Sequence, residues 1–119
     1  DDAAGKTEAS TVLEKEDTIA VYGSNEFAAK AIINANGSFK ESKLGADKII
    51  AVGFDSGALQ QDAIRNGVFA GSVVQIGYQA VKLAIASAKG ETVKDVDTGS
   101  KWYDASNIDK EEIKALLYE

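Results

Sequence analysis

The stretch IIAVGFDSG at residues 49–57 decides the fold of this chain. Its apolar run stops abruptly at Asp55, and either Asp55 or Ser56 can cap a helix that follows. Short apolar runs bounded by turn signals are typical of central strands in parallel sheets, which are covered on both faces. We therefore predict a buried strand at 48–54 whose carboxyl end presents Asp55, the position where open α/β sheets bind ligands.

The alternation of strand and helix continues on both sides of this stretch. Further strands are predicted at 18–22, 68–75 and 96–103, and helices at 2–14, 26–34, 56–65, 77–89 and 109–117. Strands that alternate with helices imply right-handed crossovers. The sequence therefore predicts an α/β fold, with a parallel sheet and helices on both faces.

Composition excludes several classes of function. The 119 residues suffice for one modest domain, and 45% apolar with 27% charged residues is typical of a globular chain. The net charge of −6 and the scattered lysines argue against nucleic acid as a partner. No apolar run of about 18 residues and no signal peptide is present, so we expect no membrane span.

Residue types that the chain lacks limit its chemistry further. Without Cys or His, it cannot form a typical zinc site or use a thiol or imidazole catalyst. It has neither a nucleophile elbow nor a glycine-rich phosphate loop, so we predict no enzymatic activity, no metal and no cofactor. Because Met is also absent, we expect Asp1 to follow a processed or trimmed start.

Polar residues stand at the ends of the first three predicted strands: Asn25, Asp55 and Gln75. The carboxyl ends of parallel strands meet at one edge of a sheet, so these side chains are expected to converge. Amides donate and accept hydrogen bonds, and a carboxylate accepts from two adjacent hydroxyls, which suits a sugar. We predict that the three bind one face of a small polyol. Taken singly, Asn25 and Asp55 are equally explained as helix caps and Gln75 as a solvated strand end.

Aromatic residues near the strand ends offer a second kind of sugar contact. Trp102 has a flat face of the kind that packs on sugar rings, and Tyr22 and Tyr78 carry hydroxyls close to strand ends. The alternative for all three is ordinary packing, within the last strand for Trp102 and in the core or at the edge for the tyrosines.

The order of four short motifs resembles the C-terminal part of type I periplasmic sugar-binding proteins, the solute-binding components of ABC transporters of the ribose-binding type. The motifs are VYGSNE at 21–26, IAVGFD at 50–55, GSVVQ at 71–75 and DTG at 97–99. The resemblance implies an incomplete lobe of a two-lobed α/β protein that closes on a sugar and delivers it to a permease. It also implies that Asn25, Asp55 and Gln75 contact the sugar.

The resemblance divides the chain into segments of different lobes. Residues 1–75 would belong to the C-terminal lobe, 76–97 to the N-terminal lobe, and 98–119 to a return strand and final helix. The N-terminal part of the protein would then lie outside this chain, and the location would be periplasmic or extracellular and membrane-associated. The helix at 77–89 would lack its partner surface, so we expect it to pair with another chain or fold back on its own sheet.

Two other functions fit parts of the pattern. A sugar-sensing domain of a LacI-type transcriptional regulator has the same architecture but requires an upstream helix-turn-helix. A phospho-receiver domain would use Asp55 as the acceptor, but it needs an acidic pair at the end of the first strand, where this chain has Gly23, Ser24 and Asn25.

Overall fold

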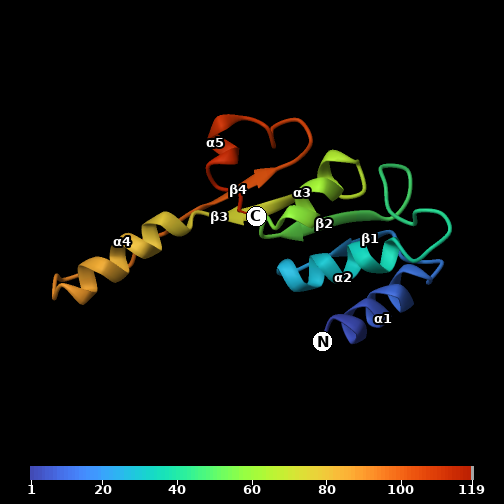
Figure 1. Ribbon diagram of the computed structural model, residues 1–119, viewed down its shortest axis with the longest axis horizontal. Coiled ribbons are helices and arrows are strands. Elements are labelled where there is room, and N and C mark those ends of the chain that lie inside the picture. Colours follow the sequence, from blue (N-terminus) through green and yellow to red (C-terminus); the bar gives the residue numbers. More distant parts are fainter. Residues whose placement is uncertain (119) are drawn as a thin grey trace.

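The computed structural model describes residues 1–118, without the side chains of Tyr78 and Gln79, so the suggested role of the Tyr78 hydroxyl lies outside the described residues. Strands and helices alternate along the chain as the sequence predicts (Figure 1). Their bounds are α1 Asp2–Leu13, β1 Ala20–Tyr22, α2 Glu26–Asn36, β2 Ile50–Phe54, α3 Ala58–Arg65, β3 Gly71–Gln75, α4 Gly77–Ala88, β4 Ser100–Tyr103 and α5 Glu111–Lys114.

The four strands form one sheet in the order β1-β2-β3-β4, in which the first three are parallel and β4 is antiparallel to β3. The direction of β4 corrects the expectation of an entirely parallel sheet. Its cause is the path of the chain: Ser100, which begins β4, pairs with Gln75, which ends β3. The chain therefore leaves and re-enters the sheet at the same end, whereas a parallel strand needs a crossover to the opposite end.

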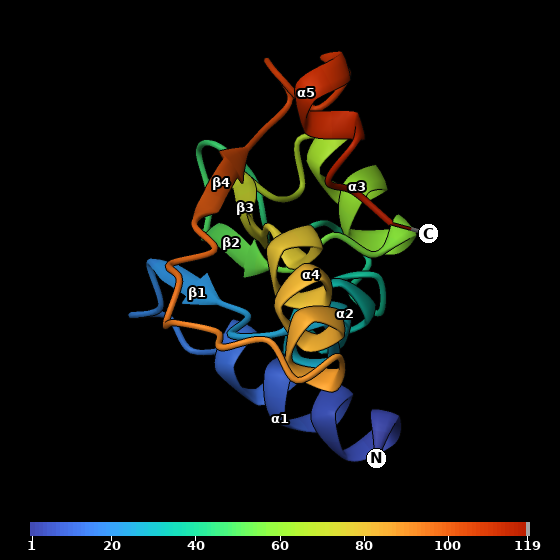
Figure 2. The ribbon, with the colours of Figure 1, turned by 90° about the vertical axis from the view of Figure 1, so that its left-hand side faces the viewer.

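Helices α1, α2 and α3 form a layer on one face of the sheet, with α2 between the other two (Figure 2). The crossovers through α2 and α3 both step the chain in the same direction along the sheet, and right-handed crossovers of that kind place their helices on one face. The α/β class is confirmed. The buried core consists of Leu13, Ala29, Ile32, Ala35, Leu44, Ala51, Ala63, Ile64, Phe69, Val74, Tyr103, Ile108 and Ile113.

The opposite face of the sheet is apolar but only partly covered. In β2, Ala51 and Gly53 are buried under the helices, whereas Val52 and Phe54 on the other face stay half-exposed. We call this surface the outer sheet face. The helices predicted for it are not found among the described residues, because both crossovers return on the core side. Its residues are Tyr22, Ile50, Val52, Phe54, Val73 and Trp102.

Helix α4 projects away from the sheet (Figure 1). Val81 and Ile85, one turn apart on α4, are 58% and 52% exposed, so the helix has not folded back on its own sheet. The radius of gyration is 16.8 Å, whereas a compact chain of this length would have about 13–14 Å. No helix within residues 1–118 combines the length and apolar character needed to cross a bilayer.

Candidate functional site

The carboxyl ends of β1, β2 and β3 form an edge of the sheet that we call the rim. Asn25 follows β1 there and caps α2, because its Oδ1 accepts a hydrogen bond from Ala28 N at 2.8 Å. The residue is exposed, and its backbone is extended (φ −160°, ψ 175°), as the first residue before a helix requires. The capping role is therefore present, and it uses the acceptor of the amide rather than its donor.

Asp55 lies directly after β2 and is half-buried. Its Oδ2 accepts a hydrogen bond from Glu26 N, the first residue of α2, at 3.1 Å. The carboxylate therefore sits at the positive end of the α2 dipole, which favours a negative charge there. Among the described groups, none donates a hydrogen bond to Oδ1. The predicted cap exists, but it belongs to α2 rather than to the helix that follows Asp55.

Gln75 ends β3 on the same rim and is exposed. Asp55 N donates to Val73 O at 2.8 Å, which places Gln75 two residues further toward the rim than the residue paired with Asp55. The fold thus brings Asn25 and Asp55 together around the start of α2. Gln75 lies on the same edge and forms no hydrogen bond to either of them within the described part of the chain, and the three remain predicted ligand contacts.

Glu26 and Tyr118 also reach the rim, and the sequence pattern did not single them out. Glu26 accepts from Lys30 Nζ at 2.7 Å and from the Tyr118 hydroxyl at 3.2 Å. The hydrogen bond from Lys30 lowers the pKa of Glu26 against a smaller opposing effect of burial, and burial raises the pKa of Tyr118. The carboxylate is thus ionised at neutral pH. The nearby Gly57 is the related feature of the sequence. It leaves room for the Glu26 carboxylate, because a Cβ at position 57 would lie 2.5 Å from Glu26 Oε1.

The end of the chain closes on the segment that follows Asp55. Tyr118 N donates to Ser56 Oγ at 3.3 Å, and Gln61 Nε2 donates to both Ser56 O at 2.7 Å and Tyr118 O at 2.9 Å. Residues 62 apart in sequence meet here. This contact places a half-exposed tyrosine ring at the rim beside the predicted ligand residues.

Buried polar groups lie beneath Asp55, and these too were missed. Tyr103 and Ser72 donate through their hydroxyls to Asp55 O at 2.8 and 2.9 Å, and Gln60 Nε2 lies 3.1 Å from the same oxygen. Burial raises the pKa of Tyr103 to about 12, with an opposing contribution from its hydrogen bond to Ser72. The phenol is therefore a permanent donor at neutral pH. The available signal was a polar Ser72 inside an apolar strand.

Trp102, the residue suggested for stacking on a sugar ring, does not lie at the rim. Trp102 pairs with Val73 in the middle of β3 and lies against Gly71, at the far end of that strand from Gln75. Its Nε1 donates to Asp104 Oδ2 at 2.9 Å. Tyr22 ends β1 and is 56% exposed on the outer sheet face. For Trp102 the packing alternative therefore fits the geometry.

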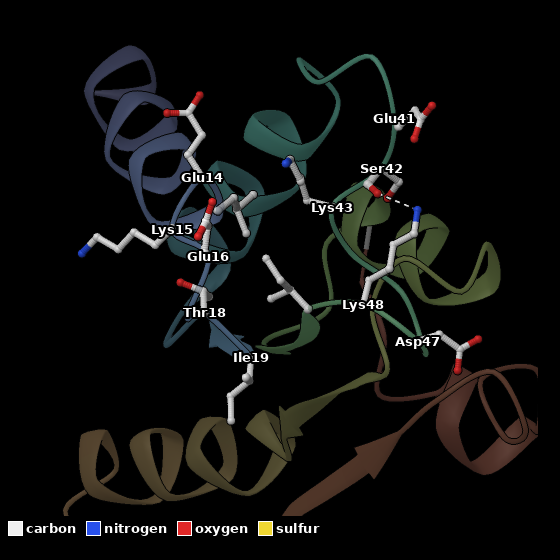
Figure 3. Close-up of a pocket in the computed structure, with 12 residues that line it drawn as sticks. Glu14, Lys15, Glu16, Thr18, Ile19, Glu41, Ser42, Lys43, Asp47 and Lys48 are labelled. Carbon is white, nitrogen blue, oxygen red and sulfur yellow. Dashed lines mark hydrogen bonds between the residues drawn. The ribbon is translucent and has the colours of Figure 1, made fainter.

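An open hollow of about 530 Å³ lies at the opposite end of the parallel strands (Figure 3). Ile19 and Ile49, which precede β1 and β2, contribute to its wall. Charged side chains of both signs line it, and many of their ends point apart. Lys48 Nζ is already held by Ser42 O at 2.7 Å. Because open α/β sheets bind ligands at the carboxyl ends of strands, the rim is the better candidate.

The described residues of the rim include no cluster that could hold a metal ion. Within residues 1–118, no group of three or more metal-ligating side chains clusters anywhere. The end of β1, where a receiver domain needs an acidic pair, carries Ser24 and Asn25, and the nearby Glu26 carboxylate is occupied by Lys30 and Tyr118. The arrangement suits hydrogen bonding to a polar ligand.

Solved structures similar to this chain include several sugar-binding proteins. A Brachyspira murdochii protein described as an ABC transporter, LacI family transcriptional regulator, is 40% identical over 100% of this chain, with a TM-score of 0.82. An ABC transporter solute-binding protein from Agrobacterium vitis with bound D-fucose is 29% identical over 98%, with a TM-score of 0.83. A carbohydrate transporter solute-binding protein from Agrobacterium radiobacter in complex with D-arabinose is 29% identical over 98%, at 0.79.

This chain covers only 40–41% of the length of each of these proteins. No protein-family model matches the chain, and no curated protein sequence does. The similarity nevertheless extends along nearly all of its residues and includes the strands that form the rim. The chain therefore has the structure of part of a type I periplasmic sugar-binding protein of the ABC-transporter class, as its four sequence motifs predict.

Proposed function

We propose that this chain supplies part of a non-catalytic binding site for a monosaccharide or a similar small polyol. The observation that carries the proposal is the Asp55 carboxylate, which is half-buried at the rim, with Oδ2 bound by Glu26 N and Oδ1 accepting no hydrogen bond from the described groups. Solved relatives of the same fold are described with D-fucose and D-arabinose bound. A carboxylate held through one oxygen can accept a hydrogen bond from a sugar hydroxyl with the other.

Asn25 and Gln75 complete the proposed contacts. Asn25 Oδ1 is used to cap α2, so its Nδ2 would donate to a sugar oxygen. Gln75 has an exposed amide that donates and accepts, which matches the dual character of a hydroxyl group. Two amides and a carboxylate on one edge thus provide donors and acceptors for several hydroxyls of one ring.

The rest of the site lies, on this proposal, in a part of the protein outside these 119 residues. Three surfaces support this inference: the free edge of β1, the half-exposed outer sheet face, and α4, whose Val81 and Ile85 are unburied. Residues 1–75 and 98–119 would form part of one lobe, and 76–97 would pack in the other. The two lobes together would close over the sugar.

The setting of this activity is inferred from the relatives. The solved proteins named above are described as transporter components or a transcriptional regulator, and none of them as an enzyme. We infer a role as the solute-binding component of an ABC transporter, located in the periplasm or outside the cell in association with the membrane. Its partners would be the sugar and the transporter permease.

The test is calorimetric titration of monosaccharides into the longer natural protein that contains this sequence. Asp55→Ala removes a hydrogen bond to a charged group, so we expect binding to weaken by about 1.5–3 kcal/mol, or roughly 10- to 150-fold. Asp62→Ala is the matched control, because this exposed carboxylate on α3 contacts Arg65 at 3.7 Å, away from the rim. Equal affinity of the wild type and Asp55→Ala would remove Asp55 from the site.

A sugar-sensing domain of a LacI-type regulator is the second candidate. One observation favours it: the structure with 40% identity carries that description alongside the transporter one. Both candidates share the sugar site and differ in the partner. A DNA-binding helix-turn-helix in the longer protein, with sugar-dependent binding to operator DNA, would support the regulator. Sugar-dependent stimulation of a permease's ATPase would support the transporter.

A further inference from the structure

Asp55 has an unusual backbone conformation. Its φ of 75° makes it the one non-glycine residue at positive φ within residues 1–118. In this left-handed region Cβ crowds the neighbouring carbonyl, so side chains other than Asn and Asp rarely occupy it. Such conformations persist where surrounding contacts over-determine them, and they cluster at ligand sites.

The contacts around Asp55 fix its backbone on both sides. Its N–H donates to Val73 O at 2.8 Å and so continues the pairing of β2 with β3. Its carbonyl turns into the core, where hydroxyls of Ser72 and Tyr103 donate to it at 2.9 and 2.8 Å and Gln60 Nε2 lies at 3.1 Å. We call Gln60, Ser72 and Tyr103 the anchor residues, and all three are fully buried.

The side chain of Gln60 is oriented so that only one end of its amide forms hydrogen bonds. Its Nε2 reaches Phe54 O, Asp55 O and Ser72 Oγ at 3.1, 3.1 and 2.6 Å, whereas its Oε1 is buried without a partner among the described groups. Turning the amide over would set Oε1 against two carbonyl oxygens. The amide therefore leaves Oε1 without a hydrogen bond, which is unfavourable, while its Nε2 holds the turn after β2.

The geometry also explains the direction of the carboxylate. A strand continued beyond Phe54 with negative φ would carry residue 55 along the sheet, like its predecessors. Because the anchor residues draw the carbonyl inward, the left-handed turn swings the Asp55 side chain to Glu26 N, 3.1 Å away at the start of α2. The left-handed conformation of the Asp55 backbone therefore determines where its carboxylate lies.

We propose that Gln60, Ser72 and Tyr103 are positioning residues, which hold Asp55 in its left-handed conformation and so present its carboxylate to the ligand. The ligand part of this inference rests on the proposed function. The conformational part concerns the folded chain alone. None of the anchor residues would touch the sugar, because all three are buried beneath the turn.

A double-mutant cycle on the 119-residue chain tests the conformational part. Tyr103→Phe removes one donor, and we expect the folding equilibrium constant from urea unfolding to fall about threefold to tenfold. Glycine keeps the same backbone carbonyl and adopts positive φ without strain, so in an Asp55→Gly background the turn persists and the same change should cost more than it does with Asp55, whose turn relaxes toward negative φ. Ser72→Ala should show the same dependence on residue 55, and it serves alone if Tyr103→Phe prevents folding.

Ser38→Ala is the matched control, because this hydroxyl donates to Asn34 O at 3.1 Å, at the end of α2 remote from the rim. Its cost should be equal with Asp or Gly at position 55. The one-bond Cα–Hα coupling of Asp55, measured by NMR, gives a second readout. In the Tyr103→Phe and Ser72→Ala variants it should move toward the range of negative φ. Equal costs in both backgrounds, together with an unchanged coupling, would overturn the proposal.

Sugar binding by the longer protein separates this proposal from the proposed function. If the anchor residues position Asp55, Tyr103→Phe should weaken binding several-fold although the residue lies outside the ligand shell. Coupling in the cycle with no sugar binding by the wild type would refute the proposed function alone. Sugar binding that depends on Asp55, with no coupling in the cycle, would refute the positioning role alone.

Discussion

The Tyr103 hydroxyl links the structure of the rim to pH, because it donates to Asp55 O only while protonated. Burial raises its pKa to about 12, whereas an unfolded tyrosine titrates near pH 10. Below pH 10 both states hold the proton, and this contribution to stability is complete. Between about pH 10 and 12 the unfolded chain loses the proton first, so stability falls by up to about 1.4 kcal/mol per pH unit.

The measurement is urea unfolding of the wild type and Tyr103→Phe from pH 8 to 12. We expect the stability difference to move by about 2–3 kcal/mol against the wild type across the upper two pH units, so that Tyr103→Phe becomes the more stable protein near pH 12. Lysines also titrate in this range, but they do so in both proteins and cancel in the comparison. A difference that stays constant to pH 12 would show that the phenol is accessible to solvent.

The sequence predicted the ends of the strands better than it predicted what holds them. Asp55 could be placed at the rim because an apolar run that stops at a polar residue reports a strand end locally. Its bond to Glu26 and its contact with Tyr103 join residues 29 and 48 positions apart. Such pairings depend on how the strands lie side by side, which periodicity does not encode. The left-handed φ of Asp55 likewise left no sign, since no glycine marks it.

At the scale of elements, the sequence predicted every helix and strand that the structure contains but not all of their lengths or directions. Strand β3 begins at Gly71 rather than at 68, and α5 is limited to Glu111–Lys114 within the predicted 109–117. The direction of β4 was wrong because alternation of strand and helix was taken to imply a crossover. Helix α4 leads outward instead, and the chain returns to the rim.

Helix α4 yields a prediction about its own packing. Val81→Ser with Ile85→Ser alters side chains that are exposed in the 119-residue chain, so we expect its unfolding free energy to change by less than about 0.5 kcal/mol. In the longer protein, where the proposed second lobe would cover α4, the pair should cost about 1.5–3 kcal/mol per side chain. Urea unfolding of both forms provides the comparison.

Ile32→Ser is the control for that experiment. Because Ile32 is buried in the core beneath the sheet, its replacement should destabilise both forms. Equal, small effects of the α4 substitutions in the two forms would show that α4 stays uncovered in the longer protein. The assignment of residues 76–97 to a second lobe would then fail.

At the scale of the whole molecule, helices cover one face of the sheet and leave apolar residues exposed on the other. The outer sheet face carries Tyr22, Ile50 and Trp102 at 56%, 36% and 44% exposure, beside the free edge of β1. Contiguous apolar surface of this kind marks an interface. Unpaired strand edges add hydrogen-bonding groups to the same region. Both features are consistent with the proposed remainder of the protein covering this side.

In isolation, the chain should use the same surface to self-associate. We expect sedimentation to show concentration-dependent association that strengthens with salt, because the net charge of −6 repels like molecules until it is screened.

Tyr22→Lys with Ile50→Lys should abolish this association by placing charges on the outer sheet face. Leu59→Lys with Thr7→Lys adds the same charge on exposed helix positions and should not. Because both pairs reduce the net negative charge equally, a general effect of charge would act alike in the two variants. Loss of association in both variants, or in neither, would therefore show that the chain does not self-associate through the outer sheet face.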